Sequence, residues 1–127
     1  MKIKNNYLIF GIILIVIIGI LLLKINEDDW IKDKRGVWIK HGNPVEISEE
    51  VEEQQQAIDC AYILFNNFSG EINSQCLGTC GNYSVDIIHV PRTGEDSLVS
   101  NQCWDYIEGT TNNLIELDKE RNIVEIV

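Results

Sequence analysis

Residues 74–92 have the sequence SQCLGTCGNYSVDIIHVPR, and this stretch decides how the rest of the chain is organised. Its first half places Cys76 and Cys80 among glycines, which permit backbone angles that other residues resist. We therefore predict a tight turn around these two cysteines. Its second half, residues 85–90, is nearly continuously apolar and predicts a central strand that Pro91 ends.

Upstream of this strand, residues 51–68 repeat apolar side chains at the spacing of a helix. The expected inward face consists of Val51, Ile58, Ala61, Tyr62, Phe65 and Phe68. The glutamates around Glu49 and Glu53 and the glutamines 54–56 are expected to face water. Two helix starts remain open: an Asn43 cap followed by Pro44, or a Ser48 cap followed by glutamates.

Two hairpins flank the central segment. Residues 30–41 predict a hairpin whose turn ends at Gly36, which would supply a left-handed residue. Residues 114–127 alternate apolar and polar side chains around a polar turn, which predicts a closing hairpin. Cys103, Trp104 and Tyr106 are expected to return to the core. The fold class is therefore α+β: one amphipathic helix on a small, mostly antiparallel sheet, stapled by disulfides.

The N-terminal part of the chain predicts a membrane anchor. Residues 7–23 contain no charge and match the short end of a membrane span, and no Ala-x-Ala cleavage pattern follows them. Lys2 and Lys4 favour a cytoplasmic N-terminus, with the following domain outside the cytoplasm. The expected parts are a cytoplasmic tail (1–6), a transmembrane signal anchor (7–23), a linker (24–29) and an extracytoplasmic α+β domain (30–127).

The charge of the chain bears on its partners. The formal net charge is −10, and from Trp30 onward seven basic residues face seventeen acidic ones. Nucleic acids and anionic lipid surfaces select basic patches. The composition therefore predicts no nucleic-acid partner and fits a soluble, self-repelling domain held at a membrane by its anchor.

The cysteine count is even, and none of the cysteines lies in the anchor. The four are Cys60, Cys76, Cys80 and Cys103. After export, this set predicts two disulfides and no free thiol. Spacing leaves three pairings open, of which we favour Cys60–Cys76 with Cys80–Cys103. A thiol oxidoreductase would instead need two cysteines separated by two residues.

A zinc site is the main alternative to disulfides. Four cysteines, with His41 or His89 as substitutes, could bind zinc, but structural zinc sites usually show two close cysteine pairs. We therefore predict no metal and no cofactor. Asn67 and Asn82 begin Asn-x-Ser sequons, which are compatible with an exported domain and with glycosylation.

Two sequence segments carry a resemblance. One joins DWI at 29–31 to GVWIKHGNP at 36–44, and the other joins QCLGTCGNY at 75–83 to VPR at 90–92. These segments resemble small archaeal signal-anchored membrane proteins that carry no assigned function, in which a Cys often stands at the position of Lys32. The resemblance implies the location and general build of the protein and no activity.

Catalytic groups are few. Asp86 and His89 would lie on opposite faces of the central strand, and no nucleophile elbow or phosphate-binding glycine loop is present. The leading hypothesis is a non-enzymatic module that binds a protein or another cell-surface component. One alternative is a small hydrolase or metal-dependent enzyme that uses Asp86, His89, Arg92 and Asp105. A second is a pilin-like filament subunit, although no prepilin-type processing site precedes the apolar run.

Overall fold

The computed structural model describes residues 2–25, 28–68 and 75–127, and within the first helix the side chains of residues 6–22. The chain divides into two compact units. The first comprises Met1–Ile31 and Lys40–Glu46, and the second comprises Lys32–Ile39 and Ile47–Val127.

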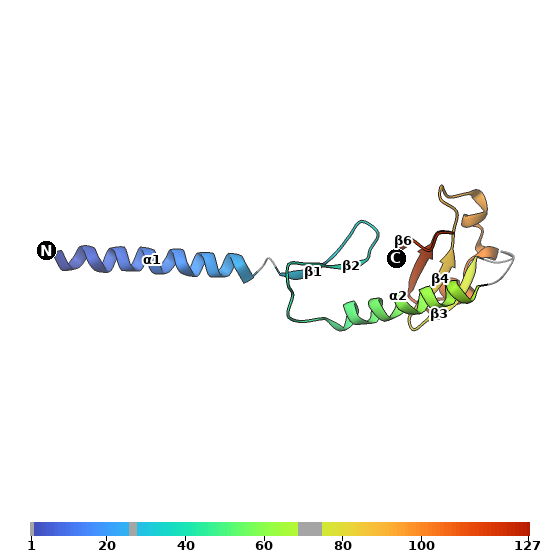
Figure 1. Cartoon of the computed structure of the whole chain (residues 1–127), viewed down its shortest axis with the longest axis horizontal. Coiled ribbons are helices and arrows are strands. Elements are labelled where there is room, and N and C mark those ends of the chain that lie inside the picture. The colour runs from blue at the N-terminus through green and yellow to red at the C-terminus, as the bar shows by residue number, and fades with distance from the viewer. Residues whose placement is uncertain (1, 26–27, 69–74) are drawn as a thin grey trace. The chain divides into compact units, whose positions relative to one another are not determined.

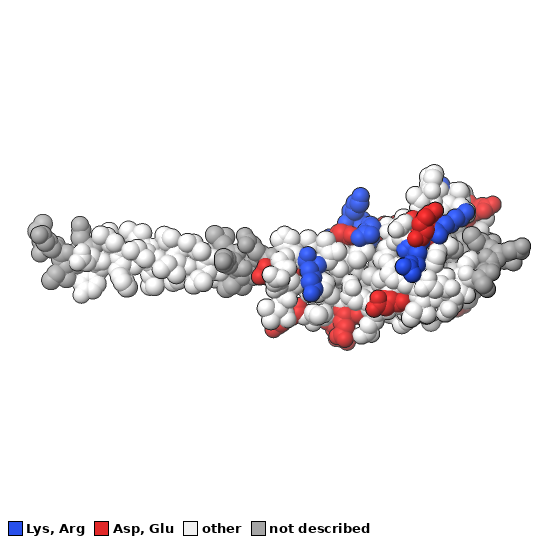
Figure 2. Space-filling model, viewed as in Figure 1, with Lys and Arg blue, Asp and Glu red and all other residues white. Residues whose placement is uncertain are grey.

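The first unit contains helix α1, Lys2–Ile25 (Figure 1). Its described side chains carry no charge (Figure 2), and all except two glycines are exposed. Within the described residues, no helix is both long and apolar enough to cross a membrane. In the same unit, Trp30 donates from Nε1 to the carbonyl of Glu46 at 3.1 Å, and Lys40 Nζ lies 5.5 Å from the Trp30 ring centroid.

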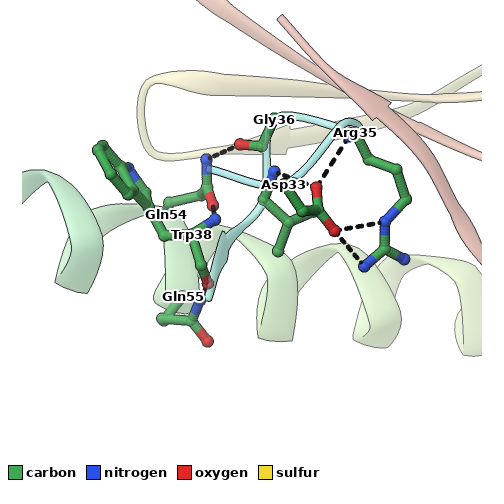
Figure 3. Close-up of polar contacts among 7 residues, drawn as sticks. Asp33, Arg35, Gly36, Trp38, Gln54 and Gln55 are labelled. Carbon is green, nitrogen blue, oxygen red and sulfur yellow. Dashed lines mark hydrogen bonds and ion pairs between the residues drawn. The ribbon is translucent and has the colours of Figure 1, made fainter. Parts of the chain in front are cut away.

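Strands β1 (Asp29–Lys32) and β2 (Trp38–His41) form a two-stranded sheet, which confirms the first hairpin. Asp33 organises the turn between them. Its Oδ1 accepts the backbone N–H of Arg35 at 2.8 Å, and its Oδ2 pairs with the Arg35 guanidinium at 2.7 Å (Figure 3). Gly36 has a φ of 79°, as predicted for the left-handed position.

Helix α2 spans Glu49–Asn67 and begins at the second of the two expected caps. The Ser48 hydroxyl accepts the backbone N–H of Val51 at 3.4 Å. A start at Asn43 is therefore wrong. The Ser48 cap satisfies a free N–H of the first turn, and three glutamates in that turn suit the helix dipole.

The inward face of α2 matches most of the predicted pattern. Val51, Ile58 and Ala61 are buried, and Tyr62 and Phe65 are half-buried against the core. Glu49 and Glu53 are exposed, as expected.

Gln54, by contrast, does not face water and is only 2% exposed. Its Oε1 accepts the N–H of Trp38 at 2.7 Å, and its Nε2 donates to the carbonyl of Gly36 at 2.9 Å (Figure 3). The helix thus buries a polar side chain because that side chain pairs with the hairpin backbone.

The second unit is built on a four-stranded sheet (Figure 1). Its strands are β3 (Cys76–Cys80), β4 (Tyr83–Ile87), β5 (Asn113–Leu117) and β6 (Ile123–Ile126), in that spatial order. The pairs β3–β4 and β5–β6 are antiparallel, and the central pair β4–β5 is parallel. The sheet is therefore mostly antiparallel, and the closing hairpin is confirmed.

The structure corrects the predicted turn. Residues 76–80 form strand β3 rather than a turn, because they pair with β4, and the sharp turn comes one residue later at Gly81, with a φ of 60°. Strand β4 begins at Tyr83 and ends at Ile87, so His89 lies beyond the strand.

All four cysteines are oxidised, as predicted, but the favoured pairing is wrong. The disulfides are Cys60–Cys80 and Cys76–Cys103. A register shift between Cys76 and Gly78 separates the two cysteines of β3 onto opposite faces. Cys80 therefore faces α2, whereas Cys76 lies on the other face, opposite Asp86.

The α2 side of the sheet holds the apolar core. Its buried members are Val37, Ala57, Ile58, Ala61, Cys80, Tyr83, Val85, Ile115, Leu117, Ile123 and Ile126. The segment after β4 contains two 3₁₀ turns, η1 (Gly94–Ser97) and η2 (Val99–Asn101), and one helical turn, α3 (Trp104–Ile107). Cys103 is fully buried, as expected, but Trp104 is 63% exposed and does not return to the core.

Candidate functional site

The face of the sheet opposite α2 carries a buried polar layer, formed by Ser84, Asp86, Thr111 and Glu116. Alternation along β4 and β5 places their polar side chains here, because Val85 and Ile115 point to the apolar core. The hydroxyls of Ser84 and Thr111 are 2.7 Å apart and satisfy each other. The layer is therefore a defined feature of the sheet.

Asp86 lies at the centre of this layer and is 1% exposed. Its Oδ1 accepts the backbone N–H of Cys103 at 3.2 Å. Glu116 is its direct neighbour in the parallel register of β4 and β5. Burial raises the pKa of Asp86 to about 6, and the negative charge of Glu116 acts in the same direction.

Arg92 closes the layer beside Glu116. Its guanidinium donates a hydrogen bond to Glu116 Oε2 from a largely exposed position. Burial raises the pKa of Glu116 above its ordinary value, although the positive charge of Arg92 opposes this shift. The positive charge of Arg92 therefore compensates the negative charge of Glu116, which is one of the two adjacent buried carboxyls.

Asp96 organises the loop after β4. Its Oδ1 accepts the backbone N–H of His89 at 3.2 Å and lies 2.9 Å from the His89 Nδ1, while its Oδ2 accepts the N–H of Thr93 at 2.6 Å. Burial raises the pKa of Asp96, but the donors from Thr93 and His89 outweigh it and hold the pKa well below its usual range. His89 is thus paired within a loop-capping network.

The four residues of the enzyme hypothesis have separate partners. Asp86 binds Cys103, His89 binds Asp96, Arg92 binds Glu116, and Asp105 accepts the Thr79 hydroxyl at 2.8 Å. The cavity of about 320 Å³ beside His89 is lined by His89, Val90, Pro91, Thr93, Lys119 and Glu120. Asp86, Arg92 and Asp105 do not line this cavity. The structure therefore brings Arg92 beside Glu116, the neighbour of Asp86, but this cavity does not gather the four residues.

Three groups could offer metal ligand atoms at one place: Cys76 Sγ, Cys103 Sγ and an Asp86 carboxylate oxygen lie within 4.8 Å of one another. The two sulfurs are joined in a disulfide and are not thiolates, the form that binds metals. No second trio of this kind occurs in residues 2–25, 28–68 and 75–127 whose side chains are described.

Sequence reasoning missed Glu116 and Asp96 as members of this network. Glu116 lies in the segment predicted as the closing hairpin, residues 114–127, and that prediction gave it no role in a site. Alternation within each predicted strand indicates which face of that strand carries Asp86 or Glu116. Nothing in the sequence specifies that β4 and β5 are neighbours, so it does not predict that these two side chains meet.

The two sequons differ in their surroundings. Asn67 is exposed at the end of α2, and its sequon continues to Ser69, which lies outside the described residues. Asn82 is half-buried, and its Oδ1 accepts the N–H of Asn112 at 3.0 Å. The two side chains are therefore not equivalent as acceptors for a glycan.

No protein-family model matches the chain, and no curated protein or solved structure is significantly similar to it.

Proposed function

We propose that the protein is a single-pass membrane protein whose C-terminal domain lies outside the cytoplasm and binds a protein or another cell-surface component. One observation carries the choice of a binder over an enzyme. Asp86, His89, Arg92 and Asp105 each make a separate structural pairing, and the cavity beside His89 is not lined by the other three. A hydrolase or metal-dependent enzyme would need such groups to converge on one substrate position.

The anchor is proposed from the sequence. Residues 7–23 carry no charge and match the short end of a membrane span. Two disulfides support the placement of the domain in an oxidising compartment.

The binding role is supported by apolar side chains on the segment that follows β4. The exposed ones are Val90, Leu98, Val99, Trp104 and Ile107. Large apolar groups at a surface are typical of contact sites, and tryptophan is enriched among the residues that dominate binding energy. Trp104, which is 63% exposed, is therefore the residue whose removal should weaken binding most.

The proposal is tested by cross-linking the full chain in its native membranes and identifying the linked protein or glycan. We expect Trp104→Ala to reduce recovery of that component at least about tenfold, the loss typical of an aromatic at an interface centre. Ile63→Ala is the matched control, because Ile63 is 60% exposed but lies on α2. Equal recovery with both variants, or recovery of no specific component by the unsubstituted chain, would contradict the proposal.

A further inference from the structure

The two disulfides have different surroundings. The sulfurs of Cys76 and Cys103 and a carboxylate oxygen of Asp86 lie within 4.8 Å of one another. Among the described side chains, no histidine or carboxylate forms an equivalent trio with Cys60 and Cys80. Only one of the two disulfides thus has a buried acid within reach of its sulfurs.

The two sulfurs of this disulfide also differ in exposure. Cys103 is fully buried, whereas Cys76 is half-buried. A thiolate from solvent can therefore reach the sulfur of Cys76 more easily than that of Cys103. The sulfur that leaves would be that of Cys103, whose Sγ lies 3.4 Å from the carbonyl oxygen of Val85.

A thiolate formed on Cys103 would be unfavourable without a proton. Burial disfavours a charged sulfur, and a nearby carbonyl oxygen is an acceptor that favours the protonated thiol. A leaving thiol departs faster when its negative charge is stabilised or neutralised. Asp86 is the acid that lies beside this sulfur, at 1% exposure.

We propose that Cys76–Cys103 is an exchange-active disulfide and that Asp86 is its proton donor and acceptor. An external thiolate, from a small thiol or a dithiol protein, attacks Cys76 Sγ and forms a mixed disulfide. The Cys76–Cys103 bond breaks, and its electron pair goes to Cys103 Sγ. That sulfur takes the proton from Asp86, which becomes a carboxylate.

The return step uses the same groups in reverse. The Asp86 carboxylate removes the proton from the Cys103 thiol, and the resulting thiolate attacks Cys76 Sγ of the mixed disulfide. The external sulfur leaves as a thiolate, and the internal disulfide forms again. Each cycle therefore returns Asp86 to its protonated form and needs only the external thiol as co-reactant.

The charged groups around Asp86 determine the pH range of the step. Glu116 faces it from β5, and Arg92 pairs with Glu116 from the loop after β4. From α3, Asp105 is held by Thr79 of β3. Burial, with the charge of Glu116 acting in the same direction, raises the pKa of Asp86 to about 6, so that the acid retains its proton in mildly acidic solution.

The test measures reduction of each disulfide in the full chain by dithiothreitol from pH 4.5 to 8, with alkylation and mass spectrometry to separate the two. Rates are divided by the concentration of dithiothreitol thiolate. For Cys76–Cys103, we expect this rate constant to fall as the pH rises through about 6 and Asp86 loses its proton. The constant for Cys60–Cys80 in the same molecules should not follow this profile.

Two variants separate proton transfer from a structural role. Asp86→Asn keeps an acceptor for the Cys103 N–H but has no exchangeable acid. We expect it to flatten the profile and to slow the reaction at pH 5 by on the order of 100-fold, the lower end of the contribution typical of a positioned acid. Glu116→Gln removes a neighbouring charge that raises the pKa of Asp86. The rate constant should therefore still fall with rising pH, but at a lower pH.

Three results would overturn the proposal. One is a flat profile for Cys76–Cys103 in the unsubstituted chain, which needs no variant to fold. The second is the same pH dependence for both disulfides. The third is an Asp86→Asn protein that folds and is reduced with the profile of the unsubstituted chain.

Discussion

At the scale of single residues, one side-chain contact and one backbone contact hold the turn of the first hairpin within the second unit. Gln54 pairs with the backbone of Gly36 and Trp38, and the carbonyl of Arg35 accepts the N–H of Ile126 at 2.7 Å. Both contacts depend on positions that no hydrophobic pattern identifies. Each of them yields a prediction with a matched control in the same chain.

Gln54→Ala should destabilise the domain by about 2–4 kcal/mol, because it leaves the part-buried N–H of Trp38 and carbonyl of Gly36 without their partner. Gln55→Ala is the control. Gln55 is exposed and makes one bond of 3.3 Å to the Trp38 carbonyl, so its loss should cost less than about 0.5 kcal/mol. Urea unfolding measures both changes, and equal costs would contradict the role of Gln54.

Gly36→Ala should cost about 1–3 kcal/mol more than Gly81→Ala. Both glycines have positive φ, 79° and 60°, so both variants carry the backbone strain of a left-handed alanine. Only at Gly36 would the new Cβ collide with a backbone atom, the carbonyl oxygen of Ile126, whereas nothing lies within 4 Å at Gly81. Thermal unfolding of the two variants compares them directly, and similar losses would mean that the turn does not pack on β6.

At the scale of elements, β3 is the strand on which the covalent links meet. Its Cys80 joins the strand to α2, and its Cys76 joins it to the segment before α3. The backbone fixes this division, since the irregular register at the start of β3 turns its two cysteines to opposite faces. One strand therefore holds a covering element on each side of the sheet.

Peptide mapping without reduction should yield Cys60–Cys80 and Cys76–Cys103 and no other pair. Replacing both cysteines of either disulfide by alanine should cost about 3–4 kcal/mol on the chain-entropy model, because the bridges close loops with sequence separations of 20 and 27. The free energies of unfolding of the two double variants, Cys60 with Cys80 and Cys76 with Cys103, are compared with each other, because their loops are of similar length. A Cys60–Cys76 peptide would contradict the assigned pairing.

At the scale of the whole molecule, the net charge bears on how stability depends on pH, and the proposed anchor bears on the side of the membrane where the domain lies. The formal net charge is −10, so acidification reduces self-repulsion in the same range in which buried carboxyls gain protons. Membrane attachment would confine this acidic domain to one side of the cell envelope. A pH dependence and a topology follow from these properties.

Stability should rise as the pH falls from 7 to about 4.5 and should decline below about pH 4. The folded pKa of Asp86, about 6, exceeds the ordinary 3.8, so its contribution is present at low pH and is lost as the pH rises through 6, by about 3 kcal/mol. Asp96 has a lowered pKa, so its contribution is present above 3.8 and is lost on further acidification. Urea midpoints across this range test both signs.

Asp86→Asn should remove most of the rise between pH 7 and 4.5, and it should leave the loss below pH 4. A variant with the full rise would mean that the dependence comes from net charge alone. A stability that increases steadily from pH 4.5 to 7 would contradict the raised pKa of Asp86.

Protease added to intact cells should remove the domain that begins at residue 30 and leave residues 7–23 in the membrane. The physical reason is that two disulfides form and persist in an oxidising space, which lies outside the cytoplasm. Immunoblotting with tags at each end checks this, with a cytoplasmic protein as the control for lysis. A domain that is cleaved only after lysis would show the opposite orientation.

The sequence by itself determined the local features of this protein. Periodicity placed α2 and its exposed glutamates, alternation and turn residues placed both hairpins, and the even cysteine count indicated two disulfides. The helix and the hairpins depend on neighbours within a few residues, which a linear pattern contains, and the number of disulfides follows from composition. The same is true of the positive φ at Gly36.

Only the tertiary structure decided which distant residues meet. The parallel pairing of β4 with β5 places Asp86 beside Glu116, and the register shift in β3 reverses the expected disulfide partners. Gln54 is buried because a hairpin backbone needs its amide. Strand order, register and burial of polar groups follow from the free energy of the whole packed domain, and no short stretch of the chain contains that information.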